Sequence, residues 1–305
     1  MEKYMRTTIT GYLDLGGKAT FEQQIEQAKK HGINAICLKK YNNSPLIELN
    51  EGEIKHIISA LKDAKLKISI IDTNIASYDI NDDRKHSIAL DEFKYMVKFS
   101  DRFKVQHLFY NLPLFNDVIE EFENIKKRIE PFIDYAMRNS KKLIMMPVNG
   151  YKANVYAYIM KKMNSNVLSY AFNPVEIMMN NESTTTAYRL LKKKIGAFHT
   201  VDADHQNVPK LIGYGKTDII ALFKKLNRDR YDGFLMIDNK FNEEVFELEQ
   251  QKSGFFAKIF KTKEKKKESM LAELSSKIFP NEETKNVTND DILENQIKVL
   301  KIIFK

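Results

Sequence analysis

The stretch that decides the fold is GAFHTVDADHQNVPKLIGYGKTDIIALFKKLNRDRYDGFLMID, residues 196–238. Its pattern predicts a buried strand, a glycine-punctuated loop with a helix, and a second buried strand, at Ala197–Val201, Thr217–Leu226 and Gly233–Ile237. His199 and Asp202 stand at the end of the first strand, and Asp238 directly follows the second. Polar residues after successive apolar strands are typical of a (β/α)8 barrel, which gathers its site at the carboxyl ends of the strands.

The same alternation runs through the rest of the chain. The apolar runs predict six further strands, at Thr8–Leu13, Ala35–Leu38, Lys67–Asp72, Val105–Tyr110, Lys142–Pro147 and Val167–Phe172. The helical periods predict Phe21–His31, Glu51–Ala64, Ser87–Phe103, Asp117–Arg138, Asn154–Met163, Thr184–Lys194, Thr217–Leu226 and Asp290–Phe304. Thr20 and Gln23 predict a capping box for the first helix. Eight strands and eight helices predict an α/β fold, a (β/α)8 TIM barrel.

Length and composition favour one barrel rather than two domains. The chain has 305 residues, of which 43% are hydrophobic, so residues 1–305 are expected to form one TIM-barrel domain. Its one cysteine, Cys37, cannot form an internal disulfide, which indicates a reducing compartment. The sequence shows neither a signal peptide nor an apolar run long enough to span a membrane, so a cytoplasmic location is expected.

The net charge of +8 is concentrated in one segment. Residues 251–270 hold seven lysines and two glutamates, whereas the remainder is close to balanced, so nucleic-acid binding is not expected. This segment lies in a charged insertion, residues 242–289, between strand eight and the last helix. There Phe255, Phe256 and Phe260 share a helical face beside the lysine run, a pattern that predicts contact with an anionic membrane surface or a protein partner. The alternative is a surface insertion whose phenylalanines pack back onto the barrel.

Several phrases resemble a known family. They are TFEQQIEQAKKHGINAICLK, EIKHIISALKDAKLKISIID, HTVDA, LIGYGKTDI and YDGFLMID. In order and spacing, residues 7–240 are similar to the sugar phosphate isomerase/epimerase superfamily, which has the xylose-isomerase-like barrel. The resemblance does not extend to the insertion. It implies a small carbohydrate ligand and proton transfer through an enediolate at the barrel mouth.

The resemblance also implies a divalent metal centre, from which this chain departs. Such enzymes typically hold one cation with Glu, Asp, His and Glu after strands five to eight. At the four positions this sequence has Met146, Asn173, His199 and Asp238. A thioether is a poor ligand for Mg²⁺ or Mn²⁺. A site for Mn, Mg or Zn would therefore rest on His199 and Asp238 and is expected to be weak or absent.

Two classes of function follow. In the first, the protein is a sugar or sugar-phosphate isomerase or epimerase with a remodelled site, whose expected catalytic residues are Asp238, Glu176 and His199. Five further residues are expected to bind substrate: Asn149, Asn173, Asp202, Asp204 and Lys240. Other strand ends should bring Tyr12, Lys39 and Asp72 to the same mouth. In the second class, the barrel is a non-catalytic ligand-binding or scaffold protein.

The loop after strand seven contains Gly213, Gly215 and Lys216. Barrels commonly bind phosphate near this place through backbone N–H groups, so the loop is a candidate phosphate site. The alternative is that the two glycines only make a turn.

Overall fold

Eight parallel strands form a nearly closed barrel in the computed structural model, which describes residues 6–13, 19–237, 270–282 and 286–304. The strands are, in chain order, β1 (Thr8–Gly11), β2 (Ala35–Leu38), β5 (Lys67–Asp72), β6 (His107–Tyr110), β7 (Lys142–Met145), β8 (Leu168–Phe172), β9 (Ile195–His199) and β12 (Phe234–Ile237). They are called barrel strands one to eight below. From β2 to β12 each barrel strand pairs in parallel with the next, and β12 pairs with β1, so the ring closes except between β1 and β2. The predicted fold class is confirmed.

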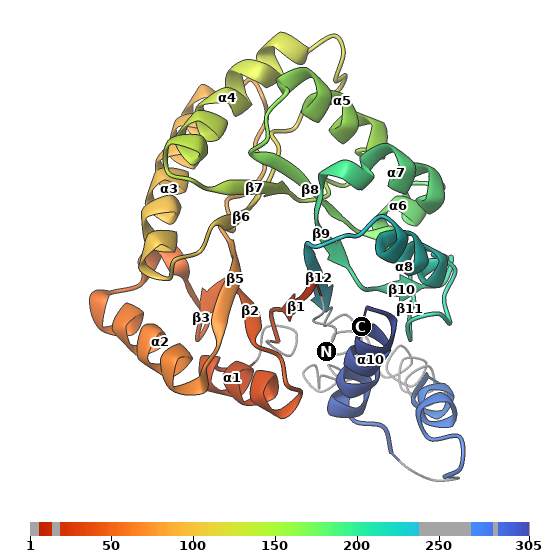
Figure 1. The fold of residues 1–305 in the computed structure, drawn as a ribbon. Coiled ribbons are helices and arrows are strands. Elements are labelled where there is room, and N and C mark those ends of the chain that lie inside the picture. Colours follow the sequence, from red (N-terminus) through yellow and green to blue (C-terminus); the bar gives the residue numbers. More distant parts are fainter. Residues whose placement is uncertain (1–5, 14–18, 238–269, 283–285, 305) are drawn as a thin grey trace, which may run out of the picture.

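The helices surround the barrel, as Figure 1 shows. They are α1 (Phe21–Lys30), α2 (Glu51–Ala64), α3 (Asp83–Arg102), α4 (Phe122–Arg138), α5 (Ala153–Met163), α6 (Pro174–Met179), α7 (Thr184–Leu191), α8 (Ile219–Arg228) and α10 (Asn289–Ile303). The predicted capping box is present, since the Thr20 hydroxyl accepts from the Gln23 N–H and the Gln23 side chain accepts from the Thr20 N–H. The short helix α6 was not predicted.

The core has two layers. The larger one packs the helices against the outer face of the barrel strands. The smaller one fills the barrel interior with one residue from each of seven strands, Cys37, Ile70, Phe109, Ile144, Ala171, Ala197 and Met236. Tyr12 and Met146 are partly buried and pack against this inner cluster. These side chains therefore fill the barrel interior at mid-height.

The described end of the insertion packs against the loop that follows β9. Residues 270–278 are helical, and Met270 and Leu274 form a buried cluster with Leu211 of that loop. The Lys210 ammonium lies 3.1 Å from a carboxylate oxygen of Glu273. Phe255, Phe256 and Phe260 lie outside the described residues. Among the residues with described structure, no helix is long and apolar enough to cross a membrane.

Candidate functional site at the barrel mouth

The strand register brings Met146, Asn173 and His199 to the carboxyl end of neighbouring strands. Tyr110 pairs with Met145, Phe172 pairs with Phe198, and His199 pairs with Met236 on β12. Each of the three residues stands two positions after a member of the inner cluster, so its side chain faces the barrel axis. Three of the four positions at which the resemblance implies metal ligands therefore share one edge of the mouth, and the fourth, Asp238, lies outside the described residues.

Asn173 has a structural task of its own. Its side-chain oxygen accepts from the backbone N–H of Val175 at 3.0 Å and of Glu176 at 3.3 Å, which makes it the N-cap of α6. Pro174 follows at the first helical position, where its missing N–H costs nothing. Glu176, expected to be catalytic, is exposed in the first turn of this helix.

The imidazole of His199, at the mouth, has a pKa well below its usual value. Burial lowers the pKa of its imidazole to about 4, so the ring is neutral at pH 7. Its Nε2 is enclosed and has no hydrogen-bond partner among the residues that the structure describes. A buried polar atom without a partner costs about 1–3 kcal/mol. His199 is thus a neutral imidazole that a ligand could satisfy.

Asp202, expected to bind substrate, points into its own loop. Its carboxylate accepts from the backbone N–H groups of Gly213 and Gly215 at 2.9 Å each and from that of Thr217 at 3.3 Å. The Thr217 hydroxyl and the Ala203 N–H complete the set, at 2.8 and 3.0 Å. The side chain is buried, and a Cβ on Gly215 would lie only 2.1 Å from its carboxylate oxygen. Asp202 therefore holds the glycine loop closed around an internal carboxylate.

The other expected substrate-binding residues are less central. Asp204 is half-buried and accepts from the backbone N–H groups of Gln206 and Val208, which shapes the turn between β10 (Asp202–Ala203) and β11 (Pro209–Lys210). Asn149 is exposed in the loop after β7. Asp238 and Lys240 lie outside the described residues, so their predicted roles stay predictions.

Across the mouth from His199, the first three barrel strands bring together a polar cluster. The Tyr12 hydroxyl donates to Asp72 Oδ2 at 2.8 Å, and the Asn74 N–H donates to Oδ1 at 2.9 Å. The Lys39 ammonium lies 3.9 Å from the same Oδ2. Asp72 is 8% exposed, whereas the Lys39 side chain is 44% exposed. Tyr12, Lys39 and Asp72, called the Asp72 cluster below, were expected at the mouth, but their mutual contacts were not.

The mouth residues that the structure describes do not fit a hard divalent cation. Met146 offers only a thioether, and the capping bonds engage the side-chain oxygen of Asn173. Within the described ranges, no three His, Cys, Asp or Glu side chains are placed to hold a metal ion. The imidazole of His199 is thus left without the carboxylates that such a centre needs from strands five and six.

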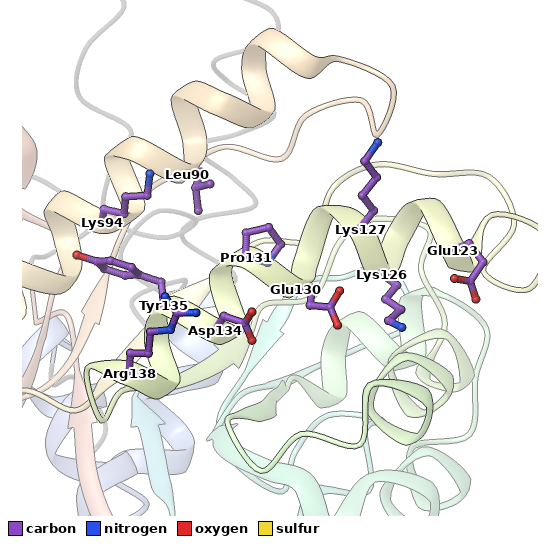
Figure 2. Close-up of a pocket in the computed structure, with 10 residues that line it drawn as sticks. All are labelled: Leu90, Lys94, Glu123, Lys126, Lys127, Glu130, Pro131, Asp134, Tyr135 and Arg138. Carbon is purple, nitrogen blue, oxygen red and sulfur yellow. The ribbon is translucent and has the colours of Figure 1, made fainter.

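A separate hollow lies on the outside of the barrel, between α3 and α4 (Figure 2). Its volume is about 500 Å³, and its lining includes Leu90, Pro131 and Tyr135. Its rim mixes both signs of charge, from Lys94, Glu123, Lys126, Lys127, Glu130, Asp134 and Arg138. Its lining comes from α3 and α4 and includes none of the residues of the candidate site.

The family follows from a comparison with family models. Residues 25–253 match the model described as xylose isomerase-like TIM barrel. The chain belongs to this family. The expected superfamily is therefore confirmed, and the match begins in α1, so it includes seven of the eight barrel strands.

Solved structures of the xylose isomerase-like fold agree with this assignment. D-psicose 3-epimerase with D-tagatose, from Clostridium cellulolyticum H10, shares 13% identity at a TM-score of 0.67, covering 98% of this chain and 100% of that one. The probable 3-DHS dehydratase AsbF from Bacillus anthracis shares 11% identity at a TM-score of 0.63, covering 81% of this chain and 100% of that one. The IOLI protein with a bound zinc atom shares 14% identity at a TM-score of 0.64, covering 89% of this chain and 99% of that one. A comparison with curated proteins gives no significant match. At these identities the likeness concerns the fold.

Proposed function

We propose that this protein binds a small carbohydrate at the barrel mouth and isomerises or epimerises it by proton transfer, without the divalent metal centre typical of its relatives. The observation that carries the proposal is the placement of two polar centres. Asp72 ends barrel strand three and His199 ends strand seven, so they face each other across the eight-stranded ring. A ligand in the mouth would lie between a carboxylate and a neutral imidazole.

The two groups suit the two halves of an enolisation. The Asp72 carboxylate would take the proton from the carbon next to the ligand carbonyl, and the bonding electrons would move onto the carbonyl oxygen. An imidazole N–H of His199 would stabilise that oxygen, which a neutral ring with a lowered pKa can do without carrying charge. Protonation of the former carbonyl carbon, with the neighbouring hydroxyl proton moving to the former carbonyl oxygen, would complete an isomerisation. Protonation of the original carbon from its opposite face would complete an epimerisation. Tyr12 orients the carboxylate through its 2.8 Å hydrogen bond.

Deuterium exchange tests this directly. Chelator-treated protein would be incubated with D-tagatose and D-psicose in D₂O, and deuterium at the carbon next to the carbonyl would be followed by NMR. We expect exchange by the wild type and its loss in Asp72→Asn and His199→Gln. Asp79→Asn, an exposed residue whose carboxylate caps a turn, is the matched control. Exchange that appears only after Mn²⁺ is added would contradict the proposal.

A second candidate function is binding without catalysis. It is favoured by Met146, which can neither accept nor donate a proton, and by the engagement of Asn173 as a helix cap. D-tagatose binding measured by calorimetry, together with no exchange with or without metal, would identify this alternative.

A further inference from the structure

Three neighbouring helices on one side of the barrel contain no acidic residue. They are α5, α7 and α8, which lie side by side in Figure 1, and the 3₁₀ turn η2 (Lys192–Lys194) directly follows α7. The basic residues of these four elements are Lys161, Lys162, Arg189, Lys192, Lys193, Lys194, Lys224, Lys225 and Arg228. The chain outside residues 251–270 is close to balanced as a whole, so this side of the barrel carries a local excess that the overall count conceals.

The ordinary preference for basic residues at helix ends does not account for this excess. Lysine and arginine are common in the last turn of a helix because the terminal carbonyl groups carry a partial negative charge. Helices α3 and α4 also end in basic residues, Arg102 and Arg138, but each carries carboxylates along its length, such as Asp91 and Asp134. On the other side of the barrel the acidic residues are missing from whole helices, and η2 adds three consecutive lysines beyond the end of α7.

Few of these charges are compensated by a carboxylate. Asp229, directly after α8, lies 3.1 Å from the Lys192 ammonium and 2.8 Å from Nε of Arg228. Within the described ranges, no ion pair engages five other exposed cations, Lys161, Lys162, Arg189, Lys193 and Lys224. These five side chains therefore present uncompensated positive charge to a partner.

An apolar side chain lies among these cations. Leu190 is 52% exposed in the last turn of α7, directly after Arg189 and just before the lysines of η2. The neighbouring helix α5 ends in Lys161 and Lys162. A partner that pairs with the cations can therefore also cover an apolar group, which adds a contact that does not depend on charge.

The composition of this surface favours a protein over a nucleic acid or a lipid bilayer. The aromatic residues of the three helices, which could stack on bases, are buried or half-buried: Tyr156, Tyr158, Tyr188 and Phe223. The carboxylates of Asp229 and Asp232, which follow α8, would face the phosphates of a nucleic acid. One exposed leucine is much less than the apolar face with which an amphipathic helix enters a membrane. Cations with a few carboxylates and an apolar side chain are typical of a surface that binds another protein by complementary charge.

We propose that this surface, called the basic sector, binds an acidic protein segment. It consists of Lys161, Lys162, Arg189, Leu190, Lys193 and Lys224. Carboxylates of the partner pair with the cations that lack a carboxylate of their own, and an apolar residue of the partner covers Leu190. The sector lies on the helical layer, so this inference does not depend on the function proposed for the barrel mouth.

Fluorescence anisotropy on the intact protein tests the inference. The probes are two fluorescein-labelled peptides of equal length and charge, one built from glutamate and leucine and the other from glutamate and serine. We expect the leucine-containing peptide to bind severalfold more tightly, because it can cover Leu190, and we expect Leu190→Ser to remove the difference. Equal binding of the two peptides by the wild type would overturn the inference, since a surface that recognises charge alone does not select a protein segment.

A pair of charge reversals locates the binding surface. Lys161→Glu with Lys193→Glu should weaken the binding of both peptides by at least about tenfold. The matched control is Lys62→Glu with Lys98→Glu, which changes the net charge equally at exposed lysines of α2 and α3 and should leave the affinity within about twofold. If a charge reversal lowers the melting temperature, Lys161→Gln with Lys193→Gln gives the same comparison with a smaller expected loss.

Three results would overturn the inference. The first is an equal loss of peptide binding in the two double variants, which would show that only the net charge matters. The second and third are tighter binding of an oligouridine RNA than of either peptide, or binding to phosphatidylserine vesicles, lost in Lys161→Glu with Lys193→Glu but kept in the control. Either would assign the basic sector to that other class of partner.

Discussion

Replacing Asp202 by alanine should destabilise the protein far more than an ordinary loop substitution. The carboxylate accepts five hydrogen bonds, from the N–H groups of Ala203, Gly213, Gly215 and Thr217 and from the Thr217 hydroxyl. Bonds to a charged group contribute about 1.5–3 kcal/mol each, and a buried donor left unpaired costs about 1–3 kcal/mol. Gly213 is exposed and would regain water, whereas Thr217 is fully buried. We therefore expect a loss of about 3–5 kcal/mol in the free energy of unfolding.

Urea unfolding followed by far-UV circular dichroism measures this loss. Asp204→Ala is the matched control, because Asp204 lies in the same loop and accepts from only two backbone N–H groups in a half-buried setting. Its expected cost is about 1 kcal/mol. Asp202→Asn keeps one acceptor oxygen and should fall between the two. A cost for Asp202→Ala within the error of that for Asp204→Ala would refute the reasoning that the loop is built around this carboxylate.

Three further outcomes are expected. In the unfolded state the imidazole of residue 199 takes up a proton near pH 6.5, whereas in the folded state buried His199 does so only near its pKa of about 4, so the free energy of unfolding should fall by about 2–3 kcal/mol as the pH drops from 6.5 toward 4. Urea titrations at several pH values should show a smaller fall for His199→Gln, and an unchanged dependence on pH would contradict this. Met146→Glu and Asn173→Asp together should strengthen Mn²⁺ binding, measured by calorimetry, more than the sum of the single changes; an additive or null result would exclude a decayed metal centre. Deleting residues 254–269 should abolish salt-sensitive binding to anionic vesicles and leave the melting temperature almost unchanged; retained vesicle binding would exclude this segment as the membrane contact.

The barrel could be predicted from the sequence because its signals are local. Each strand is a short apolar run between turn residues, and all eight predicted strands overlap those observed. Apart from the unpredicted helix α6 and short strand pairs such as β10–β11, the differences lie at the ends of elements. Residues 105–106 were expected to begin a strand, but β6 starts at His107, and α3 starts at Asp83 rather than Ser87. At Asp83 the capping side chain of Asp82 accepts from the Lys85 N–H, a signal that hydrophobic periodicity does not carry.

The candidate site was harder to predict because its contacts are not local. Tyr12 and Asp72 are 60 residues apart and meet only through the closure of the barrel. Asp202 and Thr217 are joined by a fold of the glycine loop that no residue spacing indicates. Asn173 is different, since an asparagine followed directly by a proline, with a glutamate three positions on, is a local helix-start signal. That signal indicates the capping role of Asn173, which the structure shows.

The most direct test of the central claim is a crystal structure of the chelator-treated protein with D-tagatose. The account predicts a sugar at the barrel mouth, with the carbon next to its carbonyl facing the Asp72 carboxylate and its carbonyl oxygen toward His199. A sugar bound away from the mouth, or one held through a metal ion at Met146, Asn173 and His199, would contradict it.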